Sequence, residues 1–163
     1  MTVLVKRTLA RNERGASTIE LALLMPFLAT IVIGMGDLSR AYSTKLQLEQ
    51  AAYRAVERVQ QYQSTEATYN LLKNEAVAAA TDSGFTDVTA SNVTVTFWLE
   101  CNGVRQADYD TTCSTGQTYG RWIQVDVTKT FTPSFSPVAF SRWMGSNANG
   151  SFTLHGKSGL RTQ

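Results

Sequence analysis

Hydrophobic and polar positions divide the chain into three parts with different periods. Residues 16–36 form a nearly continuous apolar run, residues 37–63 carry apolar positions at three- and four-residue spacing, and later segments alternate with a period of two. These patterns predict a membrane-length helix, an amphipathic continuation of that helix and a set of β-strands. We therefore expect an α+β protein.

The apolar run from Ala16 to Gly36 has the length of a transmembrane helix. It covers about 21 residues, or roughly 31 Å of helix, which is enough to cross the hydrocarbon core of a bilayer. The leader before it contains one acidic residue, Glu13, and four basic ones: Lys6, Arg7, Arg11 and Arg14. This charge bias favours a cytoplasmic N-terminus. The rest of the chain is then expected outside the cytoplasm.

A single carboxylate, Glu20, interrupts the apolar run. At the centre of a bilayer a carboxylate disfavours insertion by roughly 2.5–3.5 kcal/mol, so a charged group there indicates a function. The alternative is that Glu20 lies near the helix end and snorkels to the membrane surface.

Residues 37–63 predict an amphipathic helix that continues the membrane helix. This stripe is expected to pack on the chain's own sheet, or both on that sheet and on adjacent subunits. Its apolar positions are Leu38, Ala41, Tyr42, Leu48, Ala52, Ala55, Val56 and Val59.

The remaining pattern predicts a second helix and a small sheet. Ser64-Thr65-Glu66 resembles an N-cap, and the helix from Glu66 to Thr81 ends at Asp82-Ser83-Gly84. Three later segments have strand character: Val93–Leu99, Trp122–Thr128 and Phe152–Gly156. They predict an antiparallel sheet of three or four strands, with one face covered by the helices. Residues 132–150 are predicted to form a loop. Its aromatic residues indicate that it packs against the domain: Phe131, Phe135, Phe140 and Trp143.

Charge gives no reason to expect a nucleic-acid partner. The 163 residues carry a formal net charge of +2, but four of the 15 basic residues and one of the 13 acidic residues lie in residues 1–15. Without this leader the chain is close to neutral, so its basic character concerns membrane topology. The length allows one membrane helix and one modest domain.

Two cysteines, Cys101 and Cys113, lie in the part expected outside the cytoplasm. They predict one disulfide bond, which would close a loop of about 13 residues and contribute roughly 3 kcal/mol in the chain-entropy model. Two reduced thiols are the alternative. A zinc site is a poorer interpretation because a structural site needs four ligands and the only histidine, His155, lies in another strand.

The sequence does not predict an enzyme. His155 is the sole candidate for a catalytic base, and no G-x-S-x-G motif accompanies the serines. Neither a calcium-loop spacing nor a glycine-rich phosphate loop occurs. We expect no catalytic residue, metal or cofactor.

The N-terminal stretch has three interpretations: a cleaved secretory signal, an uncleaved signal anchor, or a prepilin leader. The residues R-G-A-S-T-I-E resemble a prepilin peptidase site, with Gly15 before the cut and Glu20 at the fifth mature position. The resemblance implies cleavage between Gly15 and Ala16. It also implies that Glu20 meets the new α-amine of Ala16 on a neighbouring subunit during assembly.

A more specific resemblance follows from the pattern A-x-x-x-E-L-A-L-L-M-P, which includes Pro26, and from G-D-L-S-R and Q-A-A-Y-R-A further on. These residues are similar to the TadE-like minor pilins, or pseudopilins, of the tight adherence (Tad) pilus, a type IV pilus system. The match is partial, because the family helix usually reads A-A-R-x-G-A-R.

This resemblance implies a type IV pilin-like fold and four segments. They are a prepilin leader (1–15), a transmembrane helix (16–36), its amphipathic continuation (37–63) and an extracytoplasmic α+β domain (64–163). It also implies a minor pilin of the bacterial inner membrane that initiates, caps or regulates a pilus for adhesion or secretion, or lies at its tip. The implied partners are the prepilin peptidase, another minor pilin, the major pilin and the inner-membrane assembly platform.

Two other functions remain open from the sequence. One is an unprocessed, membrane-tethered binding domain, which assigns no role to Gly15 or Glu20. The other is a pseudopilin of a type II-like secretion system, which would share the fold.

Overall fold

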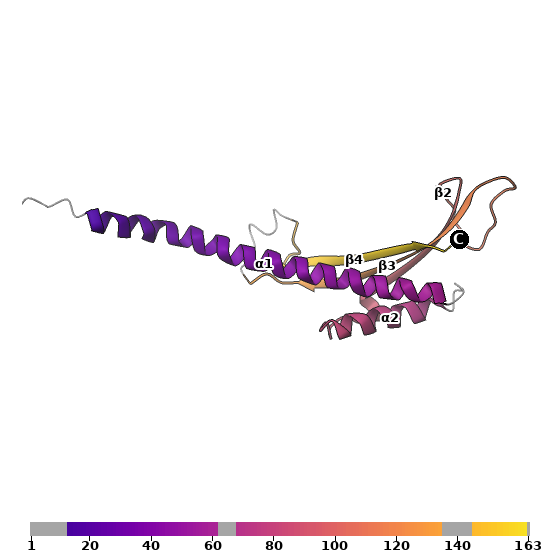
Figure 1. Ribbon diagram of the computed structural model, residues 1–163, viewed down its shortest axis with the longest axis horizontal. Coiled ribbons are helices and arrows are strands. Elements are labelled where there is room, and N and C mark those ends of the chain that lie inside the picture. Colours follow the sequence, from indigo (N-terminus) through magenta and orange to yellow (C-terminus); the bar gives the residue numbers. More distant parts are fainter. Residues whose placement is uncertain (1–12, 62–67, 135–144, 163) are drawn as a thin grey trace, which may run out of the picture.

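The computed structural model of the protein describes residues 13–61, 68–134 and 145–162. It contains the helices α1 (Glu13–Gln61) and α2 (Thr68–Asp82), the short 3-10 helix η1 (Ala90–Asn92), and four strands: β1 (Val93–Cys101), β2 (Val104–Arg105), β3 (Tyr119–Phe131) and β4 (Phe152–Arg161). The first part of α1 projects beyond the α+β domain, and the second part lies along it (Figure 1).

The four strands form one antiparallel sheet in the order β2-β1-β3-β4. β3 is an interior strand that pairs with β1 along nine positions and with β4 along ten. Helices α1 and α2 pack on one face, which we call the inner face. Because side chains alternate across a strand, the other residues of each strand form an outer face.

The hydrophobic core lies between the inner face and the two helices. α1 contributes small side chains, Ala51, Ala52 and Ala55, together with the fully buried Leu48. The inner face contributes β-branched residues, which suit a half-buried pleated surface: Val93, Val95, Ile123, Val125 and Val127. The small helix residues let α1 approach the sheet closely.

The closest approach of α1 to the sheet occurs at Gly156 in β4. A Cβ atom on this residue would lie 2.2 Å from the carbonyl carbon of Leu48 and 2.5 Å from the amide nitrogen of Glu49. These are backbone atoms, which cannot rotate away as a flexible side chain would. A glycine at this position is therefore what brings the helix onto the strand.

The second helix ends as its sequence predicts. Gly84 has a positive φ of 92°. Its N–H donates to the Thr81 carbonyl over 2.9 Å, and the Phe85 N–H donates to the Ala80 carbonyl over 3.0 Å. These two bonds form a Schellman motif, which satisfies carbonyls at the helix end. The predicted N-cap at Ser64-Thr65-Glu66 lies outside the described residues, and the described helix starts at Thr68.

The predicted α+β layout and antiparallel sheet are confirmed, but the strands are longer than predicted. Each of the three predicted segments extends further, because the pairing of β3 with β1 and with β4 continues beyond the alternating apolar core. Phe131 is the last residue of β3 instead of part of the loop. The other aromatic residues of that loop, Phe135, Phe140 and Trp143, lie outside the described residues.

Candidate functional site

The first candidate site is the N-terminal part of α1. Every residue from Ser17 to Gly36 is exposed, including large apolar side chains such as Phe27, which is 70% exposed. Within the described chain, α1 is the one helix long and apolar enough to cross a membrane. An apolar surface of this size requires a bilayer or a protein partner.

The predicted processing residues lie in the first turns of this helix. α1 begins at Glu13, so the bond between Gly15 and Ala16 is in its first turn. Glu20 is exposed on the helix surface and lies one turn after Ala16. The helix continues through Pro26, and the Thr30 hydroxyl donates a 2.7 Å hydrogen bond to the Pro26 carbonyl. This is a back-bond of the i−4 type, in which a threonine hydroxyl shares a carbonyl with the helix backbone.

The amphipathic stripe differs in part from its prediction. Leu48, Ala52, Ala55 and Val56 are buried as expected. In contrast, Leu38 is 71% exposed and Tyr42 is 63% exposed, so these two residues do not pack on the sheet. They belong to a second, outward-facing apolar side of α1. This side continues the exposed membrane segment: Leu38, Tyr42, Leu46 and Tyr53.

A polar contact fixes the point where α1 meets the domain. The first residue after the exposed segment with a partly buried side chain is Asp37. Arg40 Nη1 donates to Asp37 Oδ1 over 3.2 Å and to Ser134 Oγ over 2.7 Å, and its guanidinium lies 5.8 Å from the Phe131 ring centre. The end of β3 is thus attached to the helix within one turn of the apolar segment.

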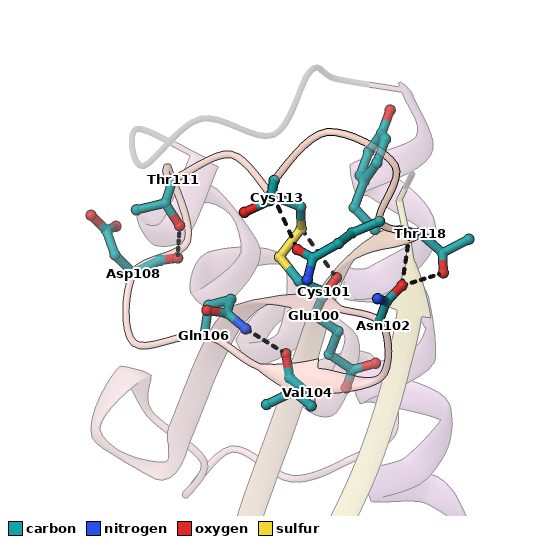
Figure 2. The surroundings of a disulfide bond; sticks show 12 residues. Glu100, Cys101, Asn102, Val104, Gln106, Asp108, Thr111, Cys113 and Thr118 are labelled. Atoms are coloured by element: carbon teal, nitrogen blue, oxygen red, sulfur yellow. Dashed lines mark hydrogen bonds between the residues drawn. A yellow bond between two sulfur atoms is a disulfide. The ribbon is translucent and has the colours of Figure 1, made fainter.

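The second candidate site is the loop between β1 and β3, at the end of the domain furthest from the exposed helix (Figure 1). The predicted disulfide between Cys101 and Cys113 is confirmed, with a Cα–Cα distance of 5.6 Å. Asn102 and Gly103 both have positive φ and turn the chain into β2. Asn102 Oδ1 accepts hydrogen bonds from the N–H and the hydroxyl of Thr118, each 2.9 Å long (Figure 2).

The sole histidine has a structural environment on the outer face. His155 Nδ1 lies 3.1 Å from both carboxylate oxygens of Asp126, and Lys157 Nζ lies 3.4 Å from one of them. Across the described ranges, no group of three or more histidine, cysteine, aspartate or glutamate side chains is placed to hold a metal ion.

A long apolar helix that continues without a break into an α+β domain is the layout of a pilin-like protein with one candidate membrane span. A family model described as TadE-like protein matches residues 15–57. The match confirms the predicted resemblance over the segment that contains Gly15, Ala16, Glu20 and Pro26, and it suggests a protein associated with the Tad pilus. No curated protein and no solved structure matches the chain.

Sequence reasoning missed the outer-face aromatic residues and the Arg40 contact. Trp98 and Trp122 both appear in predicted strands, but their pairing depends on the register between those strands, which the sequence does not specify. Arg40 lies 94 positions from Ser134, and no local pattern links them. The turn between β1 and β2 could have been predicted, because Asn102-Gly103 is a dipeptide typical of tight hairpin turns.

Proposed function

We propose that this protein is a non-catalytic minor pilin of a Tad-type pilus, matured by a prepilin peptidase that cuts between Gly15 and Ala16. The observation that carries the proposal is the wholly exposed apolar helix Ser17–Gly36, which lies inside the matched TadE-like segment and continues directly into the domain. An exposed apolar helix of this kind is suited first to the inner membrane and then to packing among other pilin helices.

The position of the scissile bond supports cleavage there. The first four N–H groups of a helix have no partner within it. Because the Gly15–Ala16 bond lies in the first turn of α1, unwinding it for a protease breaks few hydrogen bonds. The basic leader would hold the site at the cytoplasmic surface.

Cleavage also gives Glu20 a role. It creates a charged α-amine at Ala16, and both charges then lie at the start of an otherwise apolar exposed helix. In a low-dielectric environment each charge needs a partner, and a neighbouring subunit displaced along the fibre supplies one. The exposed side chains of Leu38 and Tyr42 extend the same contact surface beyond the membrane.

This function implies a defined set of partners and a location. The N-terminus lies in the cytoplasm and the domain outside it, with the chain in the inner membrane until it enters a pilus. The partners are the peptidase, a second minor pilin, the major pilin and the inner-membrane assembly platform. In the fibre the subunit primes assembly or lies at the tip.

The deciding experiment is N-terminal sequencing of the protein that accumulates in membranes, for wild type and for Gly15→Leu. We expect wild type to start at Ala16 and the variant to remain uncleaved. Gly34→Leu is the matched control, since Gly34 lies on the same helix with open space around its Cα, and it should be processed normally. A wild-type start at Met1 would indicate a tethered binding domain, and a start beyond Gly36 a secreted protein.

A second experiment separates assembly from processing. Glu20→Ala should be cleaved normally but recovered in the pilus fraction at a small part of the wild-type level. The control Glu49→Ala removes a carboxylate from the same helix outside the apolar segment, where Glu49 pairs with Lys45 at 3.6 Å. Equal incorporation of all three proteins would remove the assembly role of Glu20. Recovery with type II-like secretion components instead of the pilus would assign the protein to that system.

A further inference from the structure

The outer face of the sheet carries a row of aromatic and basic side chains at its distal end. Trp98 and Trp122 are directly opposite each other on β1 and β3, with parallel rings whose centres are 6.1 Å apart. The Arg105 guanidinium from β2 lies 4.7 Å from the Trp98 ring centre. Arg161 of β4 is opposite Trp122 on the other side. Both indole rings are half-buried, although no helix packs on this face in the described chain.

A pocket of about 320 Å³ lies beside this row and is open to solvent. Its lining comes from β1, the hairpin turn, β3 and β4: Glu100, Gly103, Thr118, Tyr119, Gly120, Trp122 and Arg161. The volume is at the lower end of the range for small-ligand sites, roughly 300–1,000 Å³. It suits one or two rings of a small polar molecule.

Gly120 allows the charged groups to converge on this pocket. It is opposite Glu100 in the β1–β3 register. A Cβ on Gly120 would lie 3.0 Å from Arg161 Nε and 3.3 Å from Trp122 Nε1. Arg161 is directed across this residue by the 2.7 Å hydrogen bond from its Nη2 to the Tyr119 carbonyl. The absence of a side chain therefore leaves room for the guanidinium and the indole edge.

The walls of the pocket are fixed before any ligand arrives. Glu100 Oε1 accepts a 2.8 Å hydrogen bond from Trp98 Nε1, which sets the direction of the carboxylate. Asn102 ties the hairpin turn to Thr118, and the disulfide at Cys101 holds the end of β1 (Figure 2). Because these walls are already ordered, the site loses little conformational entropy when a ligand binds.

We propose that this pocket binds a neutral saccharide, with Trp122, Glu100 and Arg161 as its recognition residues. A carboxylate that only accepts hydrogen bonds and a guanidinium that only donates them face the same space. Sugar hydroxyls do both, whereas Glu100 repels an anion and Arg161 repels a cation. Trp122 adds an apolar surface for the C–H groups of a sugar ring.

The indole N–H of Trp122 adds a further reason for a hydroxyl-bearing ligand. It is buried and has no hydrogen-bond partner among the described residues. A buried donor without an acceptor is costly. A sugar hydroxyl oxygen in the pocket would satisfy it after a small displacement of the Arg161 side chain, which lies over the same glycine. The pocket is lined by the part of β1 that pairs with β2, and β2 lies at the end of the domain remote from the exposed helix (Figure 1).

The proposal is tested with the full chain in lipid nanodiscs by saturation-transfer difference NMR. The probes are D-glucose, D-galactose and N-acetyl-D-glucosamine, with D-glucuronate and glycine as a charged sugar and a zwitterion. We expect at least one neutral sugar to bind with a dissociation constant in the millimolar range, about 1–10 mM. Arg161→Gln and Gly120→Ala should each weaken that binding by about tenfold or more.

Lys157→Gln is the matched control, because Lys157 lies on the same face of β4 outside the pocket, next to Asp126. It should bind as wild type does. Glu100→Gln removes the negative charge but keeps an oxygen that can accept the hydrogen bond from Trp98 Nε1. A folded Glu100→Gln protein that binds sugar more weakly therefore shows loss of recognition, not loss of folding. Thermal unfolding midpoints show whether each variant is folded. The proposal is overturned if no neutral sugar binds, if only D-glucuronate or glycine binds, or if the pocket variants bind as wild type does. It does not depend on processing or pilus assembly.

Discussion

Among single residues, Gly156 constrains the fold most tightly. Its backbone does not have a positive φ, so any residue could adopt its conformation. What excludes a side chain is the backbone of α1, because a Cβ atom would come within 2.2 Å of the Leu48 carbonyl carbon. Either the helix or the strand must move to admit even a methyl group.

Gly156→Ala is therefore expected to lower the free energy of unfolding by about 2–3 kcal/mol, at the upper end of the usual cost of overpacking. Chemical denaturation of the full chain in detergent micelles measures the change. Gly159→Ala in the same strand is the control, because its nearest atom would be the Ile123 carbonyl oxygen at 3.3 Å. A Gly156 variant as stable as the Gly159 variant would contradict the close packing described for α1.

A second residue-scale feature is the ion pair between Lys129 and Asp87. Lys129 also lies 5.0 Å from the Phe85 ring centre, so its side chain joins β3 to the link after α2. The hydrogen bond from Lys129 is the main reason that the pKa of Asp87 is lowered from its ordinary value. A lowered folded-state pKa stabilises the fold above the unfolded pKa, and this contribution is lost as the pH falls through the folded pKa.

Asp87→Asn is expected to cost about 1 kcal/mol or less at neutral pH, because Asp87 is largely exposed. The difference between wild type and variant should shrink as the pH falls below the ordinary aspartate range. Unfolding midpoints from neutral pH down to about 2 test this. Asp110→Asn, in the exposed distal loop, controls for the general loss of one negative charge. A difference that stays constant at all pH values would rule out the assigned pKa effect.

In α1, residue identity predicted the burial of small side chains well but that of larger ones only in part: Leu48 and Val56 are buried as predicted. Ala52 and Ala55 could be assigned to the helix–sheet contact because little else explains small residues at that spacing. Leu38 and Tyr42 have the same periodicity, yet they face outward. The spacing of apolar residues shows that a helix has an apolar side, but it does not show whether the chain's own sheet or another molecule covers it.

At the scale of elements, the disulfide loop is the part of the domain that depends least on the core. It joins β1 to β3, and apart from β2 it contains no regular structure in residues 102–118. The bond between Cys101 and Cys113 spans 12 positions. Its loss should therefore disorder the loop and the β1–β2 hairpin more than the helices.

The double variant Cys101→Ser, Cys113→Ser is expected to lower the free energy of unfolding by roughly 3 kcal/mol. Limited proteolysis should cut first within residues 102–118, while the α1–α2 part remains protected. Wild type treated with a reductant should behave as the variant does, which separates the bond from the substitutions themselves. Unchanged protease resistance of the loop would show that the disulfide does not hold it.

Element type followed from the sequence, but element extent and pairing did not. The change from a three-to-four-residue period to a period of two separated helices from strands correctly. β4 extends to Arg161 although its last residues, such as Ser158 and Gly159, have little strand character, because pairing with β3 stabilises them. Strand order and the Trp98–Trp122 pair depend on this long-range pairing, so local patterns could not predict them.

At the scale of the whole molecule, the length of the exposed helix relates the domain to the bilayer. Ser17–Gly36 matches the hydrocarbon thickness, and Arg40, which binds Ser134 of the domain, lies within one turn after it. If α1 spans a membrane, no spacer separates the domain from the lipid headgroups. The end of β3 then lies next to the membrane, and the disulfide loop lies at the opposite end (Figure 1).

Labelled cysteine variants test this arrangement in nanodiscs that contain lipids with a nitroxide headgroup. A fluorophore at Thr132→Cys should be strongly quenched, and one at Thr111→Cys should be quenched little. Both are exposed threonines in loops, so the comparison isolates their distance from the membrane. Equal quenching at both positions would mean that the domain does not stand on the membrane in this orientation.

The unbroken helix α1 also has a mechanical consequence. A pull on its apolar end, as during removal of a subunit from a bilayer, travels along a single rod of 49 residues to the sheet. The load passes into β4 and β3 as shear, with Leu48 against Gly156 and with Arg40 held by Ser134. Hydrogen-bonded strands loaded in shear share the force among many bonds, so the domain would follow its anchor as one body.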